Sequence, residues 1–302
     1  MVFLMLFKKL AALGSMTRPL EWSKTLANMV LGAFLAVQGL PDIGLFLIGF
    51  IAAGPLLWSG LYILNDITDI EKDKKHPIKK HRPLPSGFVS KNLALAFALI
   101  LILASLAIGY SISFFFFVCL VAMLVNQSLY TLKPFRLKER PVLDLISGSM
   151  INPLFRFFSG WTLFALNFNA PLLFLLFIVG IQFSGFTLYR LSGKKIEKKL
   201  GYKSSVIVFK EKTLKNLAYA AGIIGALSYV LITLTQDFLP SLAFLGSLPL
   251  MFIWLAVLSA FAAPLYAQAV LKPEKMDLKK MYNLIYIHNI LFIIGFVLLW
   301  LV

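Results

Sequence analysis

Four of the thirteen acidic residues of this 302-residue chain fall within nine consecutive positions, in the segment NDITDIEKD at 65–73. A continuous helix, which turns about 100° per residue, sets the aspartates of this segment on one face with Asn65 and leaves Glu71 on the other. Carboxylates so close together repel one another unless a cation compensates them, and an all-oxygen ligand set suits Mg²⁺ or Mn²⁺. Because Mg²⁺ fills its remaining positions with water and phosphate oxygens, a diphosphate is the natural co-ligand. The residues expected to bind the metal and to be catalytic are Asp66, Asp69 and Asp73.

A basic, proline-containing run, HPIKKHRPLPSG at 76–87, follows directly. Its prolines stop the helix, so the run can fold back over the acidic face. Arginine binds phosphate oxygens through a bidentate fork and lysine as a point charge. We expect Lys79 and Arg82 to bind the diphosphate. Attraction of the run to anionic lipid is the alternative interpretation, and a solvated loop whose acids balance the neighbouring lysines is the alternative for the acidic segment.

The chain that positions these residues is 60% hydrophobic, with a mean hydropathy of +0.86. Soluble domains contain roughly 45–50% apolar residues, so a bilayer must act as the solvent. Apolar runs of about 20 residues recur without an intervening globular stretch. They predict an all-α polytopic protein, one membrane domain over 1–302, with about nine transmembrane helices around a central cleft. The expected spans are 24–40, 43–64, 92–111, 113–131, 143–165, 171–191, 214–235, 244–266 and 283–302.

The net charge of +16 could indicate nucleic-acid binding, but its placement indicates membrane topology instead. Lysine and arginine gather before the first span and in 65–91, 132–142, 190–215 and 268–282, whereas the intervening connections carry none. By the positive-inside rule we expect the N-terminus and the active-site loops at 65–91 and 192–213 to be cytoplasmic, and the C-terminus external. This places the chain in the cell membrane. Residues 1–16 are expected to form an interfacial helix.

One basic residue, Arg156, lies about halfway along a predicted span. A charge there costs roughly 2.5–3.5 kcal/mol on insertion scales and usually faces a polar cavity, so a phosphate is its expected partner and a catalytic role follows. Asp144 and Asn152 lie at multiples of four from Arg156 and share its side of the helix. We expect both to contact substrate. A direct structural pair of Arg156 with Asp144 is the alternative, but some 18 Å of helical rise separates the two residues.

The segment 65–73 matches the NDxxDxxxD motif of the UbiA superfamily of intramembrane prenyltransferases, and 82–87 is similar to the RPLxSG continuation of that motif. Tyr130 and the run RLKERPVLD at 136–144 also resemble the family. The resemblance implies metal contacts for the three aspartates and a supporting role for Asn65. It further implies that Tyr130, Arg136 and Lys138 contribute to substrate binding.

The second long loop departs from that family. Most members carry a second acidic motif there, whereas this chain has the basic stretch GKKIEKKLG at 193–201, with Glu197 as its one carboxylate. Either the second metal has fewer ligands, or lysines bind an additional phosphate. We include Lys194, Lys195 and Glu197 among the expected substrate-binding residues. A basic second loop resembles the branch that makes polyprenyl-phosphoribose, as do the segments 18–24, 76–83 and 154–160.

These features lead to three hypotheses. The first is Mg²⁺-dependent transfer of an isoprenyl group from a polyprenyl diphosphate to a lipophilic acceptor. The second is transfer from phosphoribosyl diphosphate to a polyprenyl phosphate at the same metal site. The third, a transporter or lipid-binding protein without chemistry, fits poorly, because transporters place ionisable groups near the bilayer midplane and here the acids lie at its edge.

Overall fold

The structure is a computed structural model that describes residues 2–76 and 79–302; Met1, and Pro77 and Ile78 of the 65–91 loop, lie outside the described residues. The described residues are mostly helical and contain no strand, which confirms the all-α prediction. Its α-helices are α1 (Val2–Met16), α2 (Trp22–Val37), α3 (Ile43–Ile51), α4 (Ser59–Asp73), α5 (Lys91–Ile112), α6 (Phe114–Thr131), α7 (Leu143–Ile146), α8 (Asn152–Trp161), α9 (Leu172–Ser192), α10 (Lys194–Lys199), α11 (Ser205–Val208), α12 (Glu211–Thr235), α13 (Ile253–Leu271) and α14 (Leu278–Leu299).

Seven helical segments of the described chain are long and apolar enough to cross a bilayer, so this is an integral membrane protein. They are 43–73, 91–112, 114–131, 172–192, 211–235, 250–271 and 278–299. The two other predicted spans are present as α2, which has 16 residues, and as α7 and α8 joined by a π-helical turn, η5 (Ser147–Ile151). The expected number of about nine spanning helices agrees with this arrangement.

The second span runs further than expected. The helices α3 and α4 are joined by another π-helical turn, η2 (Ala52–Trp58), and form one rod that continues to Asp73. The turn contains Pro55, which has no backbone N–H to donate, and single π-helical turns inside helices are frequent near functional sites. The acidic segment is therefore the end of a rigid rod rather than a loop.

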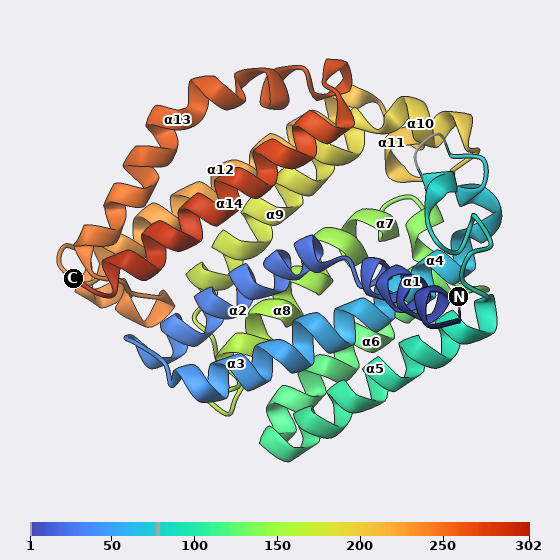
Figure 1. The fold of residues 1–302 in the computed structure, drawn as a ribbon. Helices are drawn as coiled ribbons and strands as arrows, with labels where there is room; N and C mark the ends of the chain where they lie inside the picture. Colours follow the sequence, from blue (N-terminus) through green and yellow to red (C-terminus); the bar gives the residue numbers. More distant parts are fainter. Residues whose placement is uncertain (1, 77–78) are drawn as a thin grey trace.

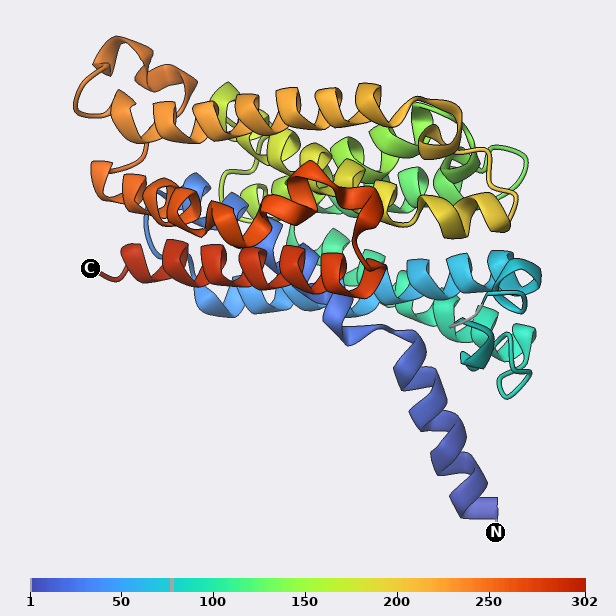
Figure 2. The same cartoon turned by 90° about the horizontal axis from the view of Figure 1, so that it is seen from above.

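Figures 1 and 2 show the long helices lying side by side, with the end of α4, α10 and α11 at one end of the bundle and the C-terminus at the other. We call the end that holds the last turns of α4 the loop end. Short 3₁₀ turns η1 (Pro19–Glu21), η3 (Lys79–His81) and η4 (Leu137–Glu139) connect helices there. Figure 2 also shows α1 projecting away from the bundle, and its expected interfacial location stays a prediction.

Helices α2 and α8 cross at glycines, so no side chain separates their backbones there. A Cβ on Gly32 would lie 2.1 Å from the Phe157 carbonyl oxygen, and a Cβ on Gly160 would lie 2.1 Å from that of Met29. Small residues allow such close approach of helices in membranes. The crossing matters for the site because α8 carries Arg156 and α2 follows directly after Arg18.

We predict that Gly160→Ala separates α2 from α8 and destabilises the protein by about 1–3 kcal/mol, the usual cost of overpacking. The measurement is the thermal unfolding midpoint in detergent, which should fall. Gly185→Ala is the matched control, since a Cβ there meets no atom within 4 Å. Equal midpoints for the two variants would contradict the close crossing.

Candidate active site

The last turns of α4 carry the three aspartates on a buried face. Asp66, Asp69 and Asp73 are 3%, 4% and 2% exposed. The side chain of Glu71 is 82% exposed on the opposite side, where it accepts a hydrogen bond from Lys74 at 2.9 Å. The helix thus continues through the motif and sorts its acids into a buried set and a solvated residue, as the 3.6-residue period requires.

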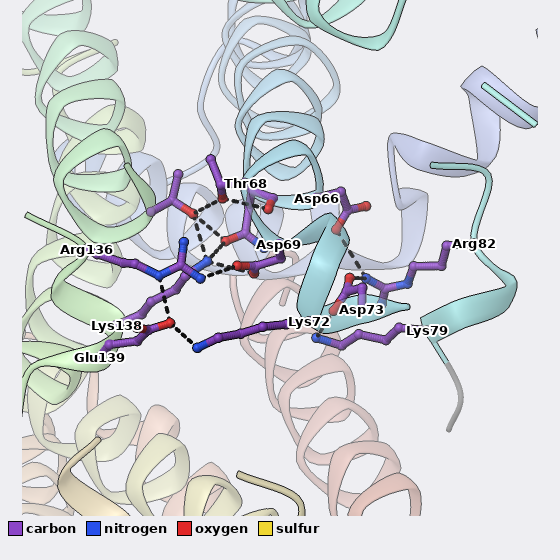
Figure 3. Close-up of polar contacts among 12 residues, drawn as sticks. Asp66, Thr68, Asp69, Lys72, Asp73, Lys79, Arg82, Arg136, Lys138 and Glu139 are labelled. Carbon is purple, nitrogen blue, oxygen red and sulfur yellow. Dashed lines mark hydrogen bonds and ion pairs between the residues drawn. The ribbon is translucent and has the colours of Figure 1, made fainter. Parts of the chain in front are cut away.

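Two of the buried carboxylates share one arginine partner, Arg82. Asp66 Oδ1 accepts hydrogen bonds from Arg18 Nη2 and, at 3.2 Å, from Arg82 Nη1. The same Arg82 nitrogen lies 3.6 Å from Asp73 Oδ2, and Lys79 Nζ lies 3.4 Å from Asp73 Oδ1. Figure 3 shows Arg82 reaching toward both aspartates from the 76–87 run. Lys79 and Arg82 of this basic run therefore lie over the acidic face, as expected.

The third carboxylate, Asp69, faces the segment that connects α6 to α7. Arg136 Nη2 and Lys138 Nζ each donate to it at 2.7 Å (Figure 3). Lys138 also donates to Asn65 Oδ1 at 2.7 Å, and that oxygen accepts a hydrogen bond from the Thr131 hydroxyl as well. Burial lowers the pKa of the Lys138 ammonium to about 8. Asn65 therefore links α4 to the residues that neutralise Asp69.

The carboxylates are separated by their cation partners rather than gathered around one point. Within the described residues, no three His, Cys, Asp or Glu side chains form a group that could hold a metal as they stand. The donor set nonetheless suits a hard divalent ion: it consists of carboxylate oxygens, and Asp73 Oδ2 is buried with no hydrogen-bond donor among the residues that the structure describes. Metal binding by this face requires the side chains to exchange the cations for the ion.

A cavity of about 530 Å³ lies beside the acidic face and deeper in the bundle. Asn65 and Arg18 connect the two regions, since each contacts the buried acidic network and also lines the cavity. A second cavity of about 610 Å³ shares the lining residues Lys24, Gln182 and Tyr286 with the first and is walled mainly by apolar side chains. Polar residues in the wall of the first cavity include Arg18, Lys24, Asn65, Tyr130, Asn152 and Arg156.

The buried arginine of the fifth span faces this first cavity. Arg156 is 6% exposed, and its guanidinium carbon lies 3.7 Å from the centre of the Trp58 ring. Its Nε is buried and has no hydrogen-bond partner in the described part of the chain. Arg156 therefore lines a cavity whose wall is mainly apolar but also contains other polar side chains. Asn152 lies in the same wall and accepts a hydrogen bond of 2.6 Å from Asn126.

The structure does not place four of the other expected residues in the cavity wall. Asp144 accepts from the Ser205 hydroxyl and pairs with Arg190 at 3.3 Å, and Glu197 pairs with the same arginine at 2.7 Å. Lys194 binds Glu211 at 2.9 Å, and Lys195 is exposed. Asp144 therefore does not share the cavity wall with Arg156, and its cation partner is Arg190 in the last turn of α9.

Sequence reasoning also missed a charged cluster at the start of α2. Glu21 accepts hydrogen bonds of 2.7 Å from the hydroxyls of Tyr282 and Tyr286 on α14, and Lys24 pairs with it at 2.7 Å. Burial raises the pKa of Glu21, but the Lys24 ammonium and the two hydroxyls outweigh this and bring it down to about 2. The sequence did contain a signal for this cluster: three charged residues lie within seven positions at the start of a span, namely Arg18, Glu21 and Lys24.

Comparison with known proteins places the chain in a family. Residues 25–293 match the model of the UbiA prenyltransferase family. The decaprenyl-phosphate phosphoribosyltransferase of Mycolicibacterium smegmatis is 30% identical over 212 residues, which cover 64% of this chain and 63% of that protein. The 4-hydroxybenzoate octaprenyltransferase of Providencia stuartii is 28% identical over 230 residues, covering 71% of this chain and 70% of that protein.

The fold agrees with the sequence match. A solved structure of a UbiA homologue from Archaeoglobus fulgidus bound to DMAPP and Mg²⁺ covers 92% of this chain and 95% of its own, with a TM-score of 0.70 at 17% identity. The alignment with the phosphoribosyltransferase spans a little under two thirds of that enzyme. Since the family model covers most of the sequence and the helices follow the same fold, the chain belongs to the UbiA prenyltransferase family.

Proposed function

We propose that this protein is a Mg²⁺-dependent intramembrane transferase that takes an isoprenyl group from a polyprenyl diphosphate and joins it to a lipophilic acceptor. The observation that carries the proposal is the buried acidic face of α4, neutralised by five basic side chains and adjoining a cavity inside a membrane bundle. A purely structural role would not need three buried carboxylates on one helix face. The A. fulgidus homologue solved with DMAPP and Mg²⁺ supports the same assignment.

In this proposal the chain binds the donor at both ends. Asp66, Asp69 and Asp73 would hold Mg²⁺, or Mn²⁺ in its place, and the basic residues released from these carboxylates would donate to the phosphate oxygens. When bound, the ion would neutralise charge that develops on the diphosphate leaving group. The mainly apolar cavity of about 610 Å³ suits a hydrocarbon tail, because it excludes water from the reacting centre.

A second candidate has a specific observation in its favour. Arg156 and Lys24 both face the cavity. Among the described residues, Arg156 has no carboxylate partner, and its Nε donates no hydrogen bond. An additional phosphate in the cavity would satisfy this arginine. That requirement fits transfer of phosphoribose from phosphoribosyl diphosphate to a polyprenyl phosphate, the substrate named for the M. smegmatis relative.

The membrane context follows from the same features. In this proposal the protein lies in the cell membrane, and by the positive-inside rule the basic residues of the loop end favour a cytoplasmic location for that end and for the N-terminus, with the C-terminus outside. Charged groups at the edge of the bundle, rather than on broken helices at its middle, disfavour a transporter without chemistry. In this proposal the hydrophobic substrate reaches the site from the lipid bilayer.

We expect Asp66→Asn and Asp69→Asn each to lower diphosphate release by about a hundredfold or more, the loss typical of removing a key electrostatic group. Asparagine keeps the shape of the side chain but not its charge. Glu71→Gln, on the exposed side of the same helix turn, is the matched control and should retain activity. Thermal unfolding of each variant checks folding. Normal turnover in either aspartate variant would refute the assignment.

Donor identity is tested by incubating the purified protein with labelled geranylgeranyl diphosphate or phosphoribosyl diphosphate, each with 4-hydroxybenzoate or a polyprenyl phosphate as acceptor. We expect diphosphate release from the prenyl donor in Mg²⁺ and none after EDTA. Release from phosphoribosyl diphosphate alone would establish the second candidate. Release from neither donor, across these acceptors, would favour a protein without chemistry.

A further inference from the structure

Arg18 lies between the acidic face and the cavity. Its Nη2 donates to Asp66, while its guanidinium carbon lies 5.1 Å from the centre of the Tyr62 ring and the residue lines the cavity of about 530 Å³. It comes from the segment before α2, 48 residues away from Asp66 in sequence. Arg18 is thus the basic partner of the acidic face that also belongs to the cavity wall with Lys24 and Arg156.

The two guanidinium groups on Asp66 conflict with metal binding. Arg18 and Arg82 both donate to Oδ1 of this carboxylate. A divalent ion on the same carboxylate would stand within a few ångström of both guanidinium groups, and like charges at that distance repel strongly in a buried setting. Arg82 has a second carboxylate within reach, Asp73, at 3.6 Å. Arg18 has the open cavity beside it instead.

The backbone at Arg18 supports a functional rather than a merely structural contact. Arg18 has φ 51° and ψ 65°, a left-handed conformation that residues with a Cβ rarely adopt, and it precedes the 3₁₀ turn η1. Arg136 has φ 44° and ψ 55° and precedes the 3₁₀ turn η4 in the same way. Each turn ends in a glutamate, and each arginine binds one aspartate of α4. Such unfavourable conformations gather at binding sites.

We propose that Arg18 is a donor-binding residue that changes partner. Without ligand it neutralises Asp66; when a divalent ion takes that carboxylate, the guanidinium moves to the phosphate oxygens of the donor. The inference rests on the proposed function and extends the diphosphate site to the segment that precedes α2. Its direct consequence is that Arg18 opposes binding of the metal alone and favours binding of the metal with a diphosphate.

The test is isothermal titration calorimetry on Arg18→Gln, first with Mn²⁺ alone and then with inorganic pyrophosphate in saturating Mg²⁺. We expect the two affinities to change in opposite directions. Mn²⁺ binds several-fold more tightly, because a competitor for Asp66 is gone. Pyrophosphate binds about tenfold to a hundredfold more weakly, because a charged hydrogen bond is lost. Arg140→Gln is the matched control, since this exposed arginine donates to the Pro134 carbonyl oxygen, and it should change neither affinity.

Each other outcome overturns the exchange. Weaker or unchanged Mn²⁺ binding would mean that Arg18 supports the metal site, and unchanged pyrophosphate binding would mean that it is a counter-ion only. Should Arg18→Gln fail to fold, Arg18→Lys, which keeps the charge but loses the fork, should show both shifts with smaller size. A wild-type protein that binds no pyrophosphate in Mg²⁺ would overturn the proposed function as well, which separates that failure from failure of the exchange alone.

Discussion

The burial of three carboxylates at the end of α4 is the constraint on which the site depends. An ionised carboxylate away from water is costly unless a cation and hydrogen bonds compensate it. The compensating cations come from three separate segments: Arg18 before α2, Lys79 and Arg82 after α4, and Arg136 and Lys138 before α7. These segments therefore converge at the loop end. Buried ion pairs add little stability on balance. Ligand binding therefore explains these pairs better than a stabilising role does.

The membrane bundle positions the rest of the site around this cluster. Trp58 is the last residue of the π-helical turn η2, and its indole ring lies under the Arg156 guanidinium. The glycine crossing of α2 and α8 brings Arg156 close to the segment that carries Arg18 and Lys24. Glu21 then holds α14 against the same cavity through two tyrosine hydroxyls. One cavity wall thus combines cations from the first and fifth spans with polar groups from the last.

Local patterns predicted the spans and the acidic face because hydrophobic length and helical period act within one segment. They could not predict with which cation each carboxylate would form an ion pair. Arg190, near the end of α9, pairs with both Asp144 and Glu197, although no spacing rule connects these residues. Glu21 meets Tyr282 across 261 residues of sequence. The sequence therefore indicated a role for the segment 18–24 only through its resemblance to the family. The position of this segment beside Asp66 depends on tertiary packing.

The most direct measurement is an experimental structure of the protein with Mg²⁺ and inorganic pyrophosphate. The account predicts that oxygens of Asp66, Asp69 and Asp73 surround the ion, directly or through water, and that the arginines and lysines now bound to these carboxylates contact the pyrophosphate instead. A structure in which the three carboxylates keep their present cation partners, with the pyrophosphate bound elsewhere, would contradict it.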